Sequence, residues 1–285
     1  MASKYVMTVP DGRQPSEAFD WVGTRLVHPM PQLPPMSPHS PEVVRVLDRI
    51  RFGLERGDTD ENDPRVGEFT WWAREYPRCY RYHLTCAEFR LRTIHALMSE
   101  IHTELADRVV ASPSVFEVGV GDERVSRVYW DFESYLSEVN NALDLLARIA
   151  GLIYRRQTPP NFNRFCKIRE DSAMLRIMQA AQSRWVVKLK SYRDCFTHFT
   201  PVDTMLSIRL VQYRDGFHIR AKLPANPDVR EILGFRYMRR VELLRYASTV
   251  WRHMAALDRA VARQIALDYA DGEYPKRTTG LFFVS

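Results

Sequence analysis

The chain has 285 residues, of which 45% are hydrophobic and 27% charged, a composition typical of a globular protein with a buried core, and its formal net charge is +6. No apolar run reaches the length of a membrane-spanning helix, and the first residues lack the apolar segment of a signal peptide. The four cysteines form no Cys-x-x-Cys pair, so we expect no disulfides. Together with the lack of a membrane-spanning run and of a signal peptide, this predicts a cytoplasmic location without membrane association.

The N-terminal part is rich in proline, with eight prolines among the first 41 residues. Proline blocks helix continuation, so we interpret residues 1–70 as an extended arm with one short helix at about 42–54. That helix has proline at its start and glycine near its end. The acidic segment 55–63 is predicted to be a loop, and residues 71–285 to form one mainly α-helical domain.

Four long helices are predicted at about 81–109, 122–154, 170–199 and 235–269. Each carries apolar residues at the three- and four-residue spacing of one buried helix face. The apolar positions of the four helices, in order, are Phe89, Ile94, Leu97, Ile101 and Leu105; Val128, Phe132, Tyr135, Val139, Leu143, Leu146, Ile149 and Ile153; Met174, Met178, Ala181, Trp185, Leu189, Tyr192, Phe196 and Phe199; and Val241, Leu244, Trp251, Met254, Val261 and Ile265. Such faces indicate the core of a helical bundle.

A β-hairpin is predicted at about 204–223, between the third and fourth helices. Apolar and polar residues alternate on both sides of Asp215-Gly216, a favoured two-residue turn. One face of this ribbon is therefore apolar, and the other carries Arg209, Arg220 and Lys222. We expect these three cations to bind an anionic substrate.

Positive charge is concentrated around the end of the third predicted helix. Residues 184–222 contain eight Lys or Arg and three Asp, which gives this region a net charge of +5. A basic surface of this kind indicates an anionic partner, and nucleic acid is the commonest one.

This helix ends with the motif Arg-x4-His, formed by Arg193 and His198, with Asp194 after the arginine. Arginine is a permanent cation suited to phosphate, and histidine moves protons near neutral pH. Asp194 is one helical turn from His198 and could orient its imidazole. Arg193 and His198 lie roughly 140° apart around a straight helix, so one helix cannot aim both at one phosphate. Either the last turn opens before Pro201, or two copies form a composite site, which is the alternative that we favour.

Further polar candidates lie on the second predicted helix. Asn140 lies beside the apolar face and, with Asn141, is predicted to bind substrate or orient Arg193; Glu138 and Asp144 are alternatives. No cluster has the spacing of a common metal site, and no phosphate-loop or dinucleotide-binding motif is present. We therefore expect no metal and no cofactor.

Over residues 84–270, the four-helix pattern with Arg-x4-His at the end of the third helix resembles the HEPN superfamily (higher eukaryotes and prokaryotes nucleotide-binding). The matching residues are Arg193, Asp194 and His198, although the family commonly has asparagine after the arginine. The resemblance implies a HEPN-like four-helix bundle, here with an inserted β-hairpin, and a homodimer whose motifs face each other. It also implies metal-independent endoribonuclease activity, often in toxin–antitoxin or phage-defence systems with an antitoxin or another partner protein.

Two other functions are compatible with the sequence. The first is a non-catalytic HEPN-like module that binds RNA, a nucleotide or a protein. The second is a helical adaptor whose proline-rich arm docks on another subunit. The convergence of Arg193 and His198 on one point, within one chain or across a two-fold axis, would distinguish the enzyme from both.

Overall fold

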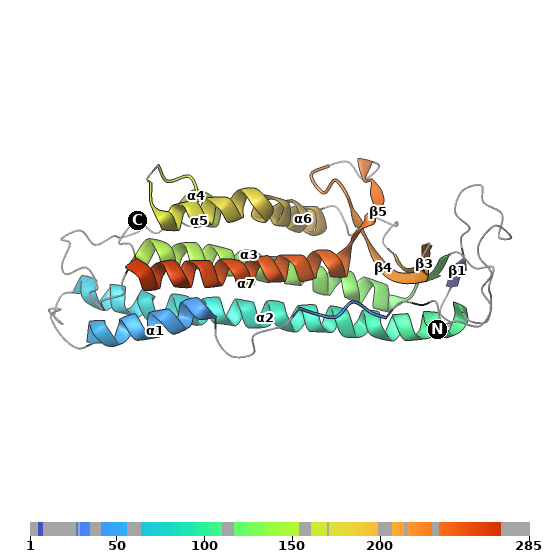
Figure 1. Ribbon diagram of the computed structural model, residues 1–285, viewed down its shortest axis with the longest axis horizontal. Coiled ribbons are helices and arrows are strands. Elements are labelled where there is room, and N and C mark those ends of the chain that lie inside the picture. Colours follow the sequence, from blue (N-terminus) through green and yellow to red (C-terminus); the bar gives the residue numbers. More distant parts are fainter. Residues whose placement is uncertain are drawn as a thin grey trace. The chain divides into compact units, whose positions relative to one another are not determined.

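The computed structural model describes residues 5–7, 27, 29–34, 41–55, 64–109, 117–153, 161–169, 171–198, 207–213, 216–229 and 234–268. The helices are α1 (Glu42–Glu55), α2 (Pro64–Val109), α3 (Glu123–Ile153), α4 (Phe162–Phe165), α5 (Ala173–Ala181), a π-helical turn (Gln182–Val186), α6 (Val187–His198) and α7 (Leu243–Asp268). The strands are β1 (Tyr5–Met7), β2 (Glu117–Val120), β3 (Ile208–Tyr213), β4 (Gly216–Pro224) and β5 (Tyr237–Glu242) (Figure 1). The described part of the protein is mainly helical, as predicted.

The chain divides into two compact units, and long helices contribute residues to both. The first unit comprises Met1–Pro34, Phe89–Tyr135 and Ser191–Thr249, and the second comprises Pro35–Glu88, Leu136–Lys190 and Val250–Ser285. The predicted boundary near residue 70 is a different division of the chain, and it stays a prediction.

The helix boundaries differ from the predicted ones in two places. The first long helix begins at Pro64 instead of 81 and continues through an internal proline, Pro77. The fourth helix begins at Leu243, because the predicted helical residues from Tyr237 to Glu242 form β5 instead. The short N-terminal helix and the second long helix lie close to their predicted positions.

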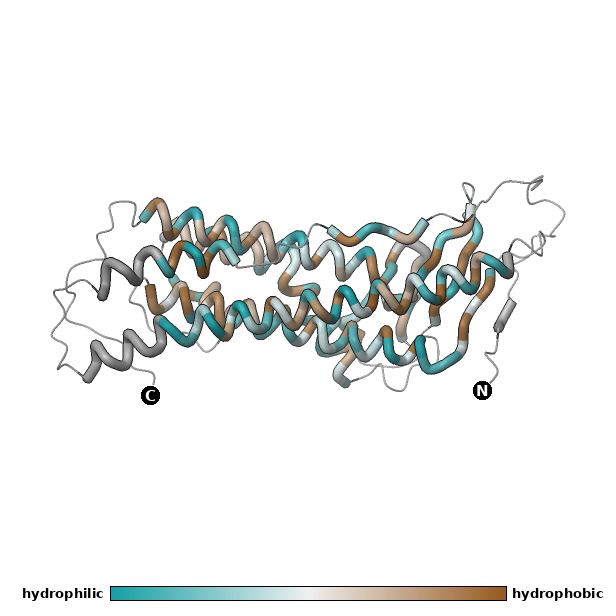
Figure 2. Tube along the Cα trace, turned by 90° about the horizontal axis from the view of Figure 1, so that it is seen from below, coloured by the Kyte–Doolittle hydropathy of each residue, from teal (hydrophilic) through white to brown (hydrophobic). Residues whose placement is uncertain are grey.

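The predicted apolar faces form most of the helical core. Hydrophobic and polar residues recur along the helices at helical spacing (Figure 2). All eight positions predicted on α3 are buried, as are the seven described positions of the third predicted helix. Phe89 is the exception on α2: its side chain is 61% exposed, and Ala87 and Leu91 are buried in its place.

The strands form one antiparallel sheet in the first unit, in the order β1-β2-β3-β4-β5. The predicted hairpin is confirmed as β3 and β4, with Arg209 opposite Arg220 and Leu210 opposite Ile219. Alternate residues of β4 are buried, as its sequence pattern predicts. The sheet is larger than the predicted hairpin, because β1 and β2 extend it beyond β3 and β5 extends it beyond β4.

Little of the proline-rich arm falls within the described residues. Within the first unit, β1 pairs with β2, and Val27 forms an isolated parallel bridge with Phe217. His95 Nε2 on α2 lies 3.0 Å from the carbonyl oxygen of Pro31. These contacts tie parts of the arm to the first unit; most of residues 1–40 lie outside the described chain.

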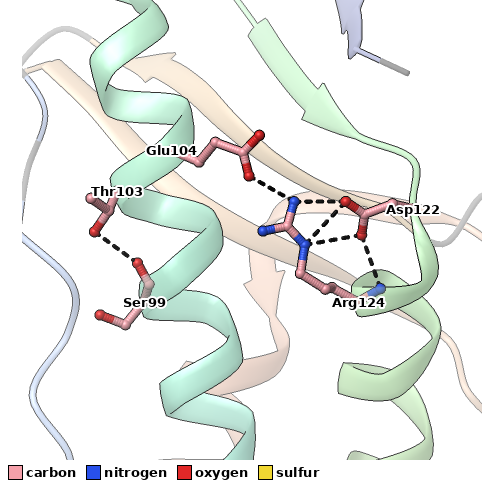
Figure 3. Close-up of polar contacts among 5 residues, drawn as sticks. All are labelled: Ser99, Thr103, Glu104, Asp122 and Arg124. Atoms are coloured by element: carbon pink, nitrogen blue, oxygen red, sulfur yellow. Dashed lines mark hydrogen bonds and ion pairs between the residues drawn. The ribbon is translucent and has the colours of Figure 1, made fainter. Parts of the chain in front are cut away.

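An arginine joins α2 to the start of α3 in the first unit (Figure 3). Asp122 caps α3 by accepting a hydrogen bond from the backbone N–H of Arg124 at 2.9 Å. The Arg124 guanidinium donates to the Asp122 carboxylate at 2.6 Å and to Glu104 on α2 at 2.7 Å. One partly buried cation therefore bridges two carboxylates and fixes the beginning of α3 against α2.

A buried carboxylate joins three helices in the second unit. Asp258 on α7 is 6% exposed and accepts a hydrogen bond from the hydroxyl of the fully buried Tyr80 on α2 at 2.9 Å. It also accepts hydrogen bonds from the backbone N–H groups of Glu42 (2.7 Å) and Val43 (3.4 Å), at the start of α1. Asp258 thus supplies from α7 the cap that α1 needs.

Candidate functional site

The Arg-x4-His motif lies at the C-terminal end of α6, and its buried neighbours fix the rotation of this helix. Tyr192 donates a 2.7 Å hydrogen bond to the carbonyl oxygen of Pro224 at the end of β4. The Phe196 ring packs against Tyr129 and Phe132 on α3, at centroid distances of 6.1 and 5.0 Å. This packing makes α3 and α6 neighbours in the first unit, and it leaves Arg193 and His198 outside the core.

Arg193 is bound to the residue that follows it. Its Nε and Nη2 atoms donate to Asp194 Oδ1 at 2.9 and 2.5 Å, and the two side chains are 33% and 53% exposed. Exposed ion pairs of this kind contribute about 0–1 kcal/mol to stability, so a phosphate can compete with Asp194 for the guanidinium. The predicted role of Asp194, to orient His198, stays a prediction.

His198 is exposed at the last residue of α6. The helix is regular up to this residue, so the predicted opening of the last turn does not occur within the described part of α6. Phe199 to Pro201 lie outside the described residues. In a regular helix, Arg193 and His198 remain roughly 140° apart. A single copy therefore presents the two groups in different directions.

The predicted asparagines belong to the second unit, whereas Arg193 and His198 belong to the first. Asn140 is 5% exposed, and its Nδ2 donates to Asp144 Oδ2 over a long 3.4 Å. The Asn140 Oδ1 atom is buried and has no hydrogen-bond partner among the described residues. Asn141 is exposed. A common site for these asparagines and Arg193 stays a prediction.

The cations predicted on the hairpin make contacts within the sheet. Arg209 donates to Glu117 Oε1 at 2.7 Å and to Ser207 Oγ at 2.9 Å. Arg220 donates to the Tyr213 hydroxyl at 2.6 Å and to the carbonyl oxygen of Val241 at 3.2 Å. Lys222 lies opposite Glu242 in the β4–β5 register. Because Glu117 neutralises Arg209 and both arginines are held by protein groups, this face is less available to an anion than the alternating pattern suggests.

A histidine–carboxylate pair that was not predicted from the sequence joins α2 and α3 in the second unit. His83 Nδ1 lies 2.5 Å from Glu138 Oε2, and each side chain is about one quarter exposed. The pair joins residues 55 positions apart, so no local motif indicates it. Within the described residues, no group of three or more His, Cys, Asp or Glu side chains is arranged to hold a metal ion.

Comparison with models of known protein families, with curated proteins and with solved structures found no match. None of the helices in the described part of the chain combines the length and the apolar character needed to cross a lipid bilayer.

Proposed function

We propose that the protein is a metal-independent endoribonuclease of HEPN type, with a composite site formed by the α6 ends of two copies. The observation that carries the proposal is the end of α6, where a partly exposed arginine and an exposed histidine lie outside the buried face. In a two-fold dimer, Arg193 of one copy and His198 of the other approach one phosphate, which removes the problem of their divergence on one helix.

The reaction is an internal transesterification of RNA. The ribose 2′-oxygen attacks the adjacent phosphorus, the new 2′-O–P bond replaces the P–O5′ bond, and the products are a 2′,3′-cyclic phosphate and a 5′-hydroxyl end. His198 serves one of the two proton transfers, from the 2′-hydroxyl or to the leaving 5′-oxygen, and water serves the other. Arg193 exchanges Asp194 for the phosphate oxygens and stabilises the charge that develops on them.

A second candidate is a non-catalytic module that binds RNA, a nucleotide or a protein. The ion pair between Arg193 and Asp194 favours it, because the negative charge of Asp194 lies beside the guanidinium that would hold the phosphate. The resemblance to the HEPN superfamily favours the enzyme. This enzyme would act in the cytoplasm, as part of a toxin–antitoxin or phage-defence system, and a partner protein would control it.

Cleavage of defined RNA in EDTA, with mapping of both new ends, tests the proposal. His198→Ala and Arg193→Ala should each lower the rate by about 10²–10⁴-fold while circular dichroism stays unchanged, because neither side chain is part of the core. Asp194→Asn should retain or raise activity, since it frees Arg193 and removes a negative charge. Wild-type protein that cleaves no RNA, or His198→Ala protein that cleaves at the wild-type rate, would favour the binding module.

A further inference from the structure

A second group of basic side chains lies on two helices of the second unit, which meet where Trp185 stacks on His253. The π-helical turn carries Arg184 and Trp185, and α7 carries Arg252 and His253. The rings of Trp185 and His253 stack with a centroid distance of 5.8 Å and an interplanar angle of 17°. Trp185 is buried, at 7% exposure, whereas the other three side chains are exposed. The indole therefore holds the imidazole plane at the surface, where the charges of Arg252 and Arg184 are near enough to act on it.

The local geometry of this cluster depends on the π-helical turn. The turn Gln182–Val186 interrupts the helix between α5 and α6 and contributes both Arg184 and Trp185. Single π-helical turns inside α-helices are rare, and they occur frequently at functional sites. The turn therefore places a cation and the aromatic support for His253 in adjacent positions of one helix.

The electrostatic environment of the cluster is positive. Burial against neighbouring groups lowers the pKa of His253, and the charges of Arg252 and Arg184 lower it further. Residues 172–190 contain no acidic residue, and Lys188 adds a cation one turn after Arg184. Asp258, the one acidic residue between positions 250 and 267, is buried and bound to Tyr80 and α1. An anion at this place would meet the guanidinium groups of Arg184 and Arg252, and its charge would favour protonation of the His253 imidazole.

We infer that Arg184, Arg252 and His253 form a second phosphate-binding site, which holds the backbone of single-stranded RNA. The forked guanidinium groups match phosphate oxygens, and the imidazole, supported by Trp185, supplies a further donor. The choice of RNA as the polymer rests on the proposed function, whereas the phosphate chemistry rests on the cluster alone. The site would give affinity without sequence preference, because it reads the backbone and not the bases.

Fluorescence anisotropy with a labelled single-stranded RNA in EDTA tests this site, on a His198→Ala background that prevents cleavage. Arg184→Gln with Arg252→Gln should weaken binding by about tenfold or more, and should reduce the slope of log affinity against log salt by about 1.4, the value for two phosphate contacts. The matched control is Arg176→Gln with Arg263→Gln, two exposed arginines of α5 and α7. The control removes the same charge and should bind nearly as the parent does. Equal affinities of the two double variants would overturn the inference.

The imidazole gives a second, independent readout. A bound phosphate favours its cationic form, so RNA affinity should increase as the pH falls from 8 to 6, while Arg184, Arg252 and Lys188 keep their charges over this range. His253→Phe keeps a ring for stacking on Trp185 and should flatten this dependence. An unchanged pH dependence in His253→Phe would exclude the imidazole from the site. Since these assays measure binding alone, their outcome is separate from whether the wild-type protein cleaves RNA.

Discussion

Replacing Asp258 with alanine should destabilise the second unit by about 2–4 kcal/mol, although this residue is far in sequence from the helix that it caps. The carboxylate accepts hydrogen bonds from Tyr80 and from two N–H groups at the start of α1. Loss of a helix cap costs about 1 kcal/mol, and a buried hydroxyl left without an acceptor costs about 1–3 kcal/mol. Asp258→Asn keeps an acceptor oxygen for one of these donors, so its cost should be about half as large or less.

The pH dependence of the same variants provides a second test. Burial raises the pKa of Asp258, and the negative charge of the nearby Glu42 side chain raises it further. Hydrogen bonds from the Tyr80 hydroxyl and from the backbone N–H groups of Glu42 and Val43 lower this pKa, but burial has the larger effect. The folded protein therefore keeps this proton to a higher pH than the unfolded chain does. The contribution of Asp258 to stability is greatest below its unfolded pKa of about 4, and it declines as the pH rises through the folded pKa. Over that window, the stability of Asp258→Asn should increase relative to the wild type.

Urea unfolding followed by circular dichroism measures both effects. Asp48→Ala, which removes an exposed aspartate from α1, is the matched control and should change the unfolding free energy by less than about 0.5 kcal/mol. Burial also raises the pKa of Glu242, but this residue is common to all the variants and cancels in the comparison. If Asp258→Ala unfolds within 0.5 kcal/mol of the control, the carboxylate does not hold α1 in place.

Two further substitutions test other parts of the structure by the same unfolding measurement. Arg124→Met should cost about 1–2 kcal/mol of unfolding free energy, because it leaves Glu104 and Asp122 without their shared cation. Arg124→Lys should recover only part of this loss, since an ammonium cannot match both carboxylates. A loss below about 0.3 kcal/mol in Arg124→Met would contradict the bridging role. Asn140→Leu should be neutral or stabilising, because it removes a buried oxygen without a partner and keeps the branched shape of the side chain. A large loss of stability would contradict this reading of the oxygen.

The helices could be predicted from sequence where buried apolar residues recur every three or four positions along the chain. The apolar face of α3 predicted the boundaries of that helix to within one residue, because all of the apolar positions on that face are buried. The start of α2 could not be predicted in this way. Proline normally ends a helix, yet Pro77 lies inside α2 between the buried residues Tyr76 and Tyr80, where tertiary packing outweighs the local cost.

The sequence predicted only two of the strands in the sheet, because strand pairing is a long-range property. The apolar residues of β5 also fit the helical spacing of α7, so this segment was predicted to be helical. A local sequence pattern does not indicate the pairing of β5 with β4. The transition to α7 is marked by Glu242, whose carboxylate accepts hydrogen bonds from the N–H groups of Leu244 and Arg245. Glutamate is not among the residues that usually cap helices, so this signal was not recognisable in advance.

The position of Arg193 and His198 outside the buried face of α6 could be predicted from sequence, but the contacts of the candidate residues could not. Spacing alone predicted that Arg193 and His198 diverge on a straight helix, and α6 is regular to His198. The bond between Arg193 and Asp194, the pairing of Arg209 with Glu117 across 92 positions and the burial of Asn140 depend on side-chain packing. The stacking of Trp185 on His253 likewise joins two helices that no sequence motif connects.

The most direct test of the composite site is complementation between two inactive variants. Arg193→Ala and His198→Ala proteins are mixed, allowed to exchange subunits and assayed for RNA cleavage in EDTA. A mixed dimer has one site with both wild-type groups, so free exchange should restore about one quarter of wild-type activity. A mixture that stays as inactive as its components, although subunit exchange is demonstrated, would contradict a site shared between two copies.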